Sequence, residues 1–258
     1  MNAIYSYWDL NLDYRVTKEW YRNDFKWLTL ALSVYHSLEH YDKVEMVTTT
    51  PMKKLFEEFE IPFTKISTEL DDLKFNRKLW ILGKIKAYSI QDDPFIHIDN
   101  DFILYEKPTL NSSILVQEFE SFDILFHKTG YKDKLDKSRE NFINKPKLFD
   151  VTDKSLCMGV YAVNDINFNK LYCSKVLNLV NDNKDYILKQ TDAIRFGIIL
   201  EQYMLSTLAE ENNIGVEEIN VDFLHLLENK YNGRYYDYIK DEVKIKLPNV
   251  YNKIKKRL

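Results

Sequence analysis

The stretch DDPFIHIDNDFILYEKP, residues 92–108, decides both the fold and the candidate site of this chain. Two short, mostly apolar and β-prone runs, 95–98 and 102–104, enclose Asp99, Asn100 and Asp101. Because side chains alternate along an extended segment, Asp99 and Asp101 share one side of it. Neighbouring carboxylates suit a hard divalent cation that also binds substrate phosphates. The stretch therefore predicts a Mn²⁺ or Mg²⁺ site at the end of a strand.

Strands and helices alternate in the residues before this stretch. The patterns predict strands at 3–8 and 44–47, a further short strand to which 61–63 leads, and helices at 27–38, from 50 onward and at 79–88. Thr50 is the predicted N-cap of the second helix, with Pro51 at its first position. This alternation is typical of a parallel α/β sheet, in which ligands bind beyond the carboxyl ends of the strands. Asp99 and Asp101 are predicted to lie at such an end.

The second half of the chain is less regular. It predicts strands at 114–119, 123–126 and 155–164, a charged loop or helix at 130–146, helices at 167–180 and 186–211, an extended segment at 216–227 and a basic helical end from 235. The sequence contains no convincing linker and no repeats. We therefore predict one domain over 1–258, with a nucleotide-binding half (1–110), an acceptor half (111–235) and a basic helical tail (236–258).

The composition is that of a globular protein, with 45% hydrophobic and 29% charged residues. The net charge of −4 gives nucleic-acid binding no electrostatic support. The 18 Tyr suit sugar binding as well as ordinary core and surface packing. Only Cys157 and Cys173 are present, which fits reduced thiols, and the N-terminal residues do not resemble a signal peptide. A cytoplasmic protein without a membrane span is the expectation.

A cation held by two carboxylates needs further ligands, and a histidine is the best candidate. The chain has five: His36 and His40 on a helix face, His97 before the Asp pair, His127 at a strand end, and His225. His225 lies between leucines, so a packed core histidine is the alternative interpretation. We nevertheless choose His225 as the third metal ligand.

The order of these motifs resembles that of nucleotide-sugar glycosyltransferases with the GT-A fold, most closely the glycogenin-like and galactosyltransferase-like families. The matching residues are Tyr5–Trp8, Lys78 or Lys84, Asp99-Asn100-Asp101, Met158-Gly159-Val160, Glu201-Gln202, and His225 with Lys230. The resemblance covers about residues 3–232. Two departures stand out: the late histidine lacks a Gly-x-x-Lys-Pro context, and Glu201 replaces an aspartate.

The resemblance implies a GT-A-like fold and a metal-dependent transfer of a sugar, most simply from a UDP-sugar, to a hydroxyl of a glycan or glycolipid. It implies that Tyr5, Tyr7 and Trp8 stack on the base, that Lys84, Lys230 and Asp99 bind the donor, and that Glu201 and Gln202 face the reacting sugar. If the reaction inverts the anomeric centre, Asp123, Asp192 and Glu201 are all candidates for the general base. The alternatives are a solvated Lys84, core-packed aromatics and a surface Glu201.

Two other functions stay open at this stage. Asp-Asn-Asp also opens haloacid-dehalogenase-like phosphatases, although that fold needs the motif on its first strand. The tripeptide is equally a good turn former, which fits a non-catalytic module that binds carbohydrate or nucleotide. Finally, the basic end predicts weak peripheral contact with an anionic inner membrane face through its cations: Lys244, Lys246, Lys253, Lys255, Lys256 and Arg257.

Overall fold

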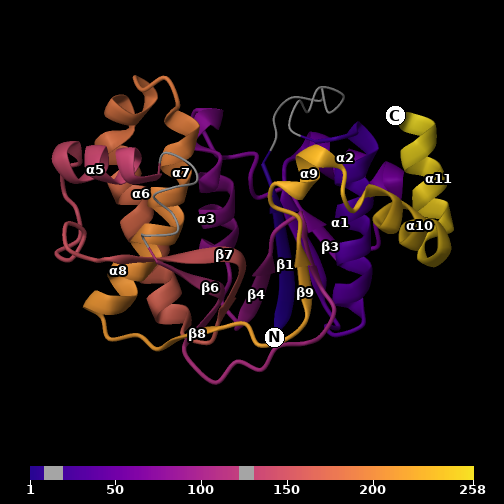
Figure 1. Cartoon of the computed structure of the whole chain (residues 1–258), viewed down its shortest axis with the longest axis horizontal. Coiled ribbons are helices and arrows are strands. Elements are labelled where there is room, and N and C mark those ends of the chain that lie inside the picture. Colours follow the sequence, from indigo (N-terminus) through magenta and orange to yellow (C-terminus); the bar gives the residue numbers. More distant parts are fainter. Residues whose placement is uncertain (9–19, 122–130) are drawn as a thin grey trace. The chain divides into compact units, whose positions relative to one another are not determined.

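The computed structural model describes residues 1–8, 20–121 and 131–258 (Figure 1). A seven-stranded mixed sheet has the strand order β3-β2-β1-β4-β7-β6-β8. Its strands are β1 (Asn2–Tyr7), β2 (Val44–Thr48), β3 (Lys65–Ser67), β4 (Phe95–Ile98), β6 (Ile114–Ser121), β7 (Lys154–Val163) and β8 (Val216–Glu218). β1, β2 and β3 are parallel, β6 is parallel to β8, and β6 is antiparallel to β7. The predicted α/β class, a mostly parallel sheet flanked by helices, is confirmed.

The chain divides into two compact units, and the first consists of Met1–Asp71, His97–Thr109 and Asn220–Leu258. Its helices are α1 (Asn23–Leu38), α2 (Thr50–Phe59), α9 (Asn229–Asn232), α10 (Tyr236–Lys246) and α11 (Pro248–Arg257). A small second sheet pairs β5 (Phe102–Leu104) with β9 (Phe223–His225). The apolar helix α1 packs against β5, α10 and α11. The core of this unit therefore joins the segment after the Asp pair to the C-terminal residues.

The second unit consists of Asp72–Ile96 and Leu110–Ile219. Its larger helices are α3 (Ile81–Ser89), α5 (Tyr131–Asn141), α6 (Ile166–Leu188) and α8 (Met204–Glu211), and α3 packs on α6. Between α6 and α8 lie a 3₁₀ turn η2 (Ala193–Arg195), one turn α7 (Phe196–Ile198) and a π-helical turn η3 (Ile199–Tyr203). A further 3₁₀ turn, η1 (Arg77–Leu79), precedes α3. Both units are discontinuous in sequence, and the single domain with two continuous halves stays a prediction.

The short strand expected after 61–63 is β3, and two predicted helices differ from the observed ones. The chain leaves α2 through left-handed Glu60 and joins β2 at Thr64, whose N–H bonds the Val44 carbonyl, so the strand that follows 61–63 is Lys65–Ser67. Helix α2 begins at Thr50, so Thr49 and not Thr50 is its N-cap.

The predicted helix at 186–211 is interrupted. Residues up to 188 continue α6, and η2, α7, η3 and α8 follow after a break at 189–192. The break falls on Gln190-Thr191-Asp192, where polar and β-branched side chains weaken the helix. The predicted strand at 123–126, Asp123 and His127 lie outside the described residues.

Two further expectations concern the surroundings of the protein. Among the residues described by the structure, no helix is both long and apolar enough to cross a membrane. Cys157 and Cys173 are buried free thiols.

Candidate functional site

The candidate site begins in the tight turn that joins β4 to β5. The N–H of Phe102 bonds the carbonyl of Asp99 at 3.0 Å and closes this turn. Asn100 donates from Nδ2 to the backbone carbonyl of Ser6 in β1 (2.9 Å), and His97 Nε2 lies 2.9 Å from the Ser6 hydroxyl. One residue of β1 thus fixes the residues on both sides of Asp99.

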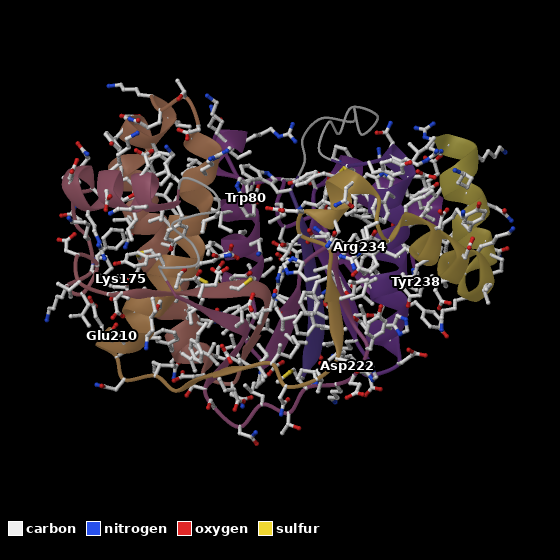
Figure 2. All side chains as sticks on the ribbon, viewed as in Figure 1. Trp80, Lys175, Glu210, Asp222, Arg234 and Tyr238 are labelled. Carbon is white, nitrogen blue, oxygen red and sulfur yellow. The ribbon has the colours of Figure 1, made fainter. Side chains whose placement is uncertain are left out.

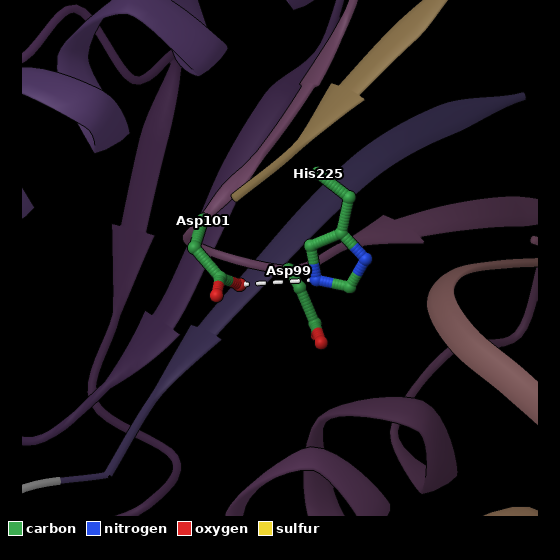
Figure 3. A group of neighbouring side chains, drawn as sticks. All are labelled: Asp99, Asp101 and His225. Atoms are coloured by element: carbon green, nitrogen blue, oxygen red, sulfur yellow. Dashed lines mark ion pairs between the residues drawn. The ribbon is translucent and has the colours of Figure 1, made fainter. Parts of the chain in front are cut away.

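The third side chain of the site comes from the other end of the sequence. β9 runs antiparallel to β5 with His225 opposite Phe102, which puts the imidazole next to Asp101. Ligand atoms of Asp99, Asp101 and His225 all lie within 4.8 Å of one another. Figure 3 shows the Asp101 carboxylate facing the His225 ring, with Nε2 and Oδ1 3.6 Å apart, and Asp99 beside them. The structure therefore brings together all three residues that the sequence predicts as metal ligands.

Lys230 reaches the same carboxylate from the helical turn α9. Its ammonium donates to Asp101 Oδ2 at 2.8 Å, while His225 faces Oδ1. The chain turns between these two residues through Leu227, a non-glycine residue with φ of +44°. A side chain in this left-handed region costs about 1–3 kcal/mol, a strain that is found where surrounding contacts fix the backbone. Because of this turn, side chains from β9 and from α9 both lie beside the Asp101 carboxylate.

The charge of Asp101 is stabilised although its side chain is only 13% exposed. Burial by itself raises the pKa of this carboxyl, but the adjacent His225 and Lys230 more than offset that effect and hold the pKa well below its ordinary value. Burial likewise lowers the pKa of Lys230, and the charge of Asp101 more than restores it. Asp101 is therefore a carboxylate and Lys230 an ammonium over the neutral pH range.

The donor set fits a divalent cation. Two carboxylates supply hard oxygen atoms, and the imidazole nitrogen favours Mn²⁺ over Mg²⁺, which prefers an all-oxygen shell. Asn100 Oδ1 is buried and has no hydrogen-bond partner among the described residues, so an acceptor is left over beside the carboxylates. A buried acceptor without a partner is costly, and a hydrated cation would satisfy it.

The three aromatic residues predicted to stack on a base have different surroundings. Tyr5 is fully buried, and its hydroxyl bonds those of Ser33 (2.7 Å) and Ser37 (2.8 Å) in α1, so it contributes to the core. Tyr7 is half-buried, and its hydroxyl accepts a hydrogen bond from Lys26. Trp8 is also half-buried, and its indole N–H is shielded from solvent without an acceptor among the described residues.

The remaining predicted residues belong to the second unit. Lys84 in α3 and Glu201 in η3 form a buried ion pair, with Nζ and Oε1 2.6 Å apart. Tyr88 donates to Glu201 Oε1 (3.2 Å), and Tyr172 donates to the Glu201 backbone carbonyl (3.1 Å). The alternatives of a solvated Lys84 and a surface Glu201 are therefore wrong. Gln202, next in the π-helical turn, is half-buried.

Sequence patterns missed the residues that support the site. Ser6 and His97 are buried and hold the loop, yet serine and histidine within apolar strands carry no signal of that role. The left-handed turn at Leu227 has no glycine or asparagine to mark it. Gly233, with φ of +72°, does mark the end of α9, just before Arg234, which is labelled in Figure 2.

The profile of the family of unknown function DUF6734 matches residues 1–221, and the chain belongs to this family. No curated protein matches it at a significant level.

Several solved structures are similar at low identity. The galactosyltransferase LgtC, in complex with donor and acceptor sugar analogs, is 13% identical over 79% of this chain and 71% of its own, with a TM-score of 0.41. The glycosyltransferase GlyE of Streptococcus pneumoniae TIGR4 is 10% identical over 96% and 52%, with a TM-score of 0.40. The inositol-1-phosphate CTP transferase of T. maritima is 13% identical over 94% and 96%, with a TM-score of 0.41. No activity follows from similarity at this level.

Proposed function

We propose that this protein is a metal-dependent glycosyltransferase that moves a sugar from a nucleoside diphosphate sugar to an acceptor hydroxyl. The observation that carries the proposal is the cluster of Asp99, Asp101 and His225, with ligand atoms within 4.8 Å of one another although the histidine lies far along the chain. Such a donor set at the end of a sheet strand suits a cation that a diphosphate also binds. When bound, the ion would offset the negative charge that develops on the departing diphosphate.

The chain's own residues have separate roles in this proposal. Asp99, Asp101 and His225 hold the ion, and Lys230, already beside Asp101, binds the anionic part of the donor. Trp8 stacks on the base or donates its N–H to it, with Tyr7 nearby in sequence; Tyr5 supports both from the core. The acceptor is a hydroxyl of a glycan or glycolipid.

Gln202 faces the reacting sugar in this proposal, and Glu201 beside it in the sequence is held by its ion pair with Lys84. Glu201 lies within the π-helical turn η3, and such turns occur often at functional sites. Removal of one partner of a buried ion pair is also strongly destabilising. Activity must therefore be measured beside stability for variants of these residues.

The basic tail has partners of its own within the first unit. Lys253 pairs with Glu60 (2.5 Å), Lys255 with Asp24 (2.6 Å) and Arg257 with Glu58 (3.4 Å). Lys246 pairs with Glu242 (3.7 Å) as well, which leaves Lys244 and Lys256 as the cations for the proposed weak contact with an anionic membrane face. The cytoplasmic location stays a prediction. Vesicle binding that is unchanged after removal of the tail would contradict the membrane contact.

Titration calorimetry with Mn²⁺ and UDP tests the metal site. We expect UDP to bind tightly only with Mn²⁺, and Asp101→Asn to weaken Mn²⁺ binding by about 100-fold. Asp222→Asn is the matched control, because Asp222 is exposed at the start of the same β9 segment and makes the same change of charge. Equal Mn²⁺ affinity in wild type and Asp101→Asn would refute the site.

Turnover separates the alternatives. Mn²⁺-dependent hydrolysis of a UDP-sugar, lost in Asp101→Asn, supports a transferase that uses water when no acceptor is present. Hydrolysis of a phosphate monoester without any action on UDP-sugars would support the phosphatase. Tight binding of a carbohydrate or a nucleotide, with no turnover in the presence of acceptor glycans, would support the non-catalytic module.

A further inference from the structure

Lys230 binds one oxygen of Asp101, a carboxylate that is also a predicted ligand of the proposed metal site. Its Nζ lies 2.8 Å from Asp101 Oδ2, and the nearby charge of Asp99 adds to its electrostatic stabilisation. The side chain is 24% exposed, so the pair is shielded from water more than an ordinary surface pair. An ammonium and a divalent cation both need this carboxylate, and they repel each other at such short range.

We propose that Lys230 is an internal counter-cation, which neutralises Asp101 in the metal-free protein and is displaced when a divalent cation binds. This inference rests on the proposed function, and it adds a coupling between two ligands of the same site. Before the metal binds, the lysine prevents an uncompensated charge on Asp101. After the metal binds, the released ammonium is available to an anion beside the ion.

The backbone around Lys230 is tied by hydrogen bonds, and two aromatic rings lie within reach of its ammonium. The Lys230 carbonyl accepts from the N–H of Tyr21 (2.8 Å), and the N–H of Leu226 bonds the Asp101 carbonyl (3.0 Å). These bonds tie the segment on both sides of the strained turn. The aromatic rings of Trp20 and Tyr231 lie 6.0 and 5.6 Å from Nζ, at the range where ring faces attract cations. Rotation of the side chain alone therefore moves the ammonium without moving α9.

The ligand that takes the released ammonium is a diphosphate. Its oxygens can bind the metal and the lysine at once. Because binding free energies are reciprocal, the metal must then raise diphosphate affinity by the same factor by which the diphosphate raises metal affinity. This coupling depends on Lys230, because its ammonium moves from the Asp101 carboxylate to the diphosphate.

Lysine reactivity tests the displacement directly in the wild-type protein. Acetylation by a succinimidyl ester, read at each lysine by mass spectrometry, is expected to be slow at Lys230 and to rise several-fold when Mn²⁺ alone is added. Lys240 is the internal control, because it pairs with Asp237 at 2.7 Å and is 27% exposed, close to the values for Lys230. Unchanged Lys230 acetylation at saturating Mn²⁺ would overturn the inference.

Titration calorimetry of Lys230→Gln gives the second test, with Lys240→Gln as the matched variant. Removal of the competing ammonium is expected to tighten Mn²⁺ binding about fivefold or more in the absence of nucleotide, and to reduce the mutual enhancement of Mn²⁺ and UDP by a similar factor. Lys230→Arg keeps the charge and should keep most of the coupling. Equal or weaker Mn²⁺ binding by Lys230→Gln would overturn the inference. If wild type binds no Mn²⁺, the proposed metal site itself fails, so the two failures are distinguishable.

Discussion

The buried pair of Lys84 and Glu201 gives the sharpest prediction about stability. The two charged atoms lie 2.6 Å apart, and the side chains are only 9% and 2% exposed. Glu201→Gln keeps the size of the side chain and an acceptor for Tyr88, but it removes the negative charge beside a buried ammonium. Loss of one partner of a buried ion pair costs about 3–5 kcal/mol, because the remaining charge is left without compensation. We expect this loss for Glu201→Gln and for Lys84→Met.

Guanidinium unfolding followed by circular dichroism measures the effect. The double variant Lys84→Met/Glu201→Gln is expected to recover more than half of the loss, since it leaves no isolated charge. The exposed pair of Lys53 and Glu57 in α2, 3.9 Å apart, serves as the control, and the corresponding changes there should cost about 0.5 kcal/mol or less. A cost below about 1 kcal/mol for Glu201→Gln, or a double variant as unstable as the sum of the single ones, would refute the reasoning.

Three further predictions concern the first unit. Burial raises the pKa of Asp24, but hydrogen bonds from Lys255 and Tyr236 lower it below the ordinary value. The stability that Asp24 contributes is therefore present above its unfolded-state pKa and lost as the pH falls through its folded-state pKa. Asp24→Asn should accordingly make the melting temperature fall less steeply with decreasing pH on the acid side. Gly233→Ala would bring a Cβ within 2.5 Å of the Tyr21 ring at a φ of +72°, and we expect a loss of about 1–3 kcal/mol by chemical denaturation; an unchanged free energy of unfolding would contradict the described turn. Leu227→Asn should raise that free energy by up to about 1 kcal/mol because asparagine tolerates a left-handed backbone, and a loss above about 1 kcal/mol would show that the leucine side chain matters more than the strain.

Local sequence patterns predicted much of the fold. Apolar runs located β1, β2, β4 and β7, because each strand interior is buried, and Pro51 placed the start of α2 within one residue. The apolar residues 61–63 lie in the loop that leaves α2 and lead into β3, Lys-Ile-Ser, which pairs with β2 but has little apolar pattern of its own. The bounds of that strand follow from backbone pairing, which the pattern of a single sequence does not reveal.

The site was predictable to the extent that its chemistry is local. Asp99 and Asp101 are one residue apart, so their shared orientation follows from the sequence. The position of His225 beside them depends on the pairing of β5 with β9, which no local pattern reveals. His225 was chosen as the best available histidine, and the resemblance to GT-A enzymes supported that choice. The pairing of Lys84 with Glu201 also depends on tertiary packing, which is why the sequence left a surface Glu201 open as an alternative.

The central claim is that Asp99, Asp101 and His225 hold one metal ion. Electron spin echo modulation of protein-bound Mn²⁺ measures this most directly, because a coordinated imidazole nitrogen gives a distinct ¹⁴N signal. We expect that signal in the wild type and in His40→Gln, and its loss in His225→Gln, with weak or no Mn²⁺ binding in Asp101→Asn. A ¹⁴N signal that persists in His225→Gln, or tight Mn²⁺ binding that never shows one, would contradict the account.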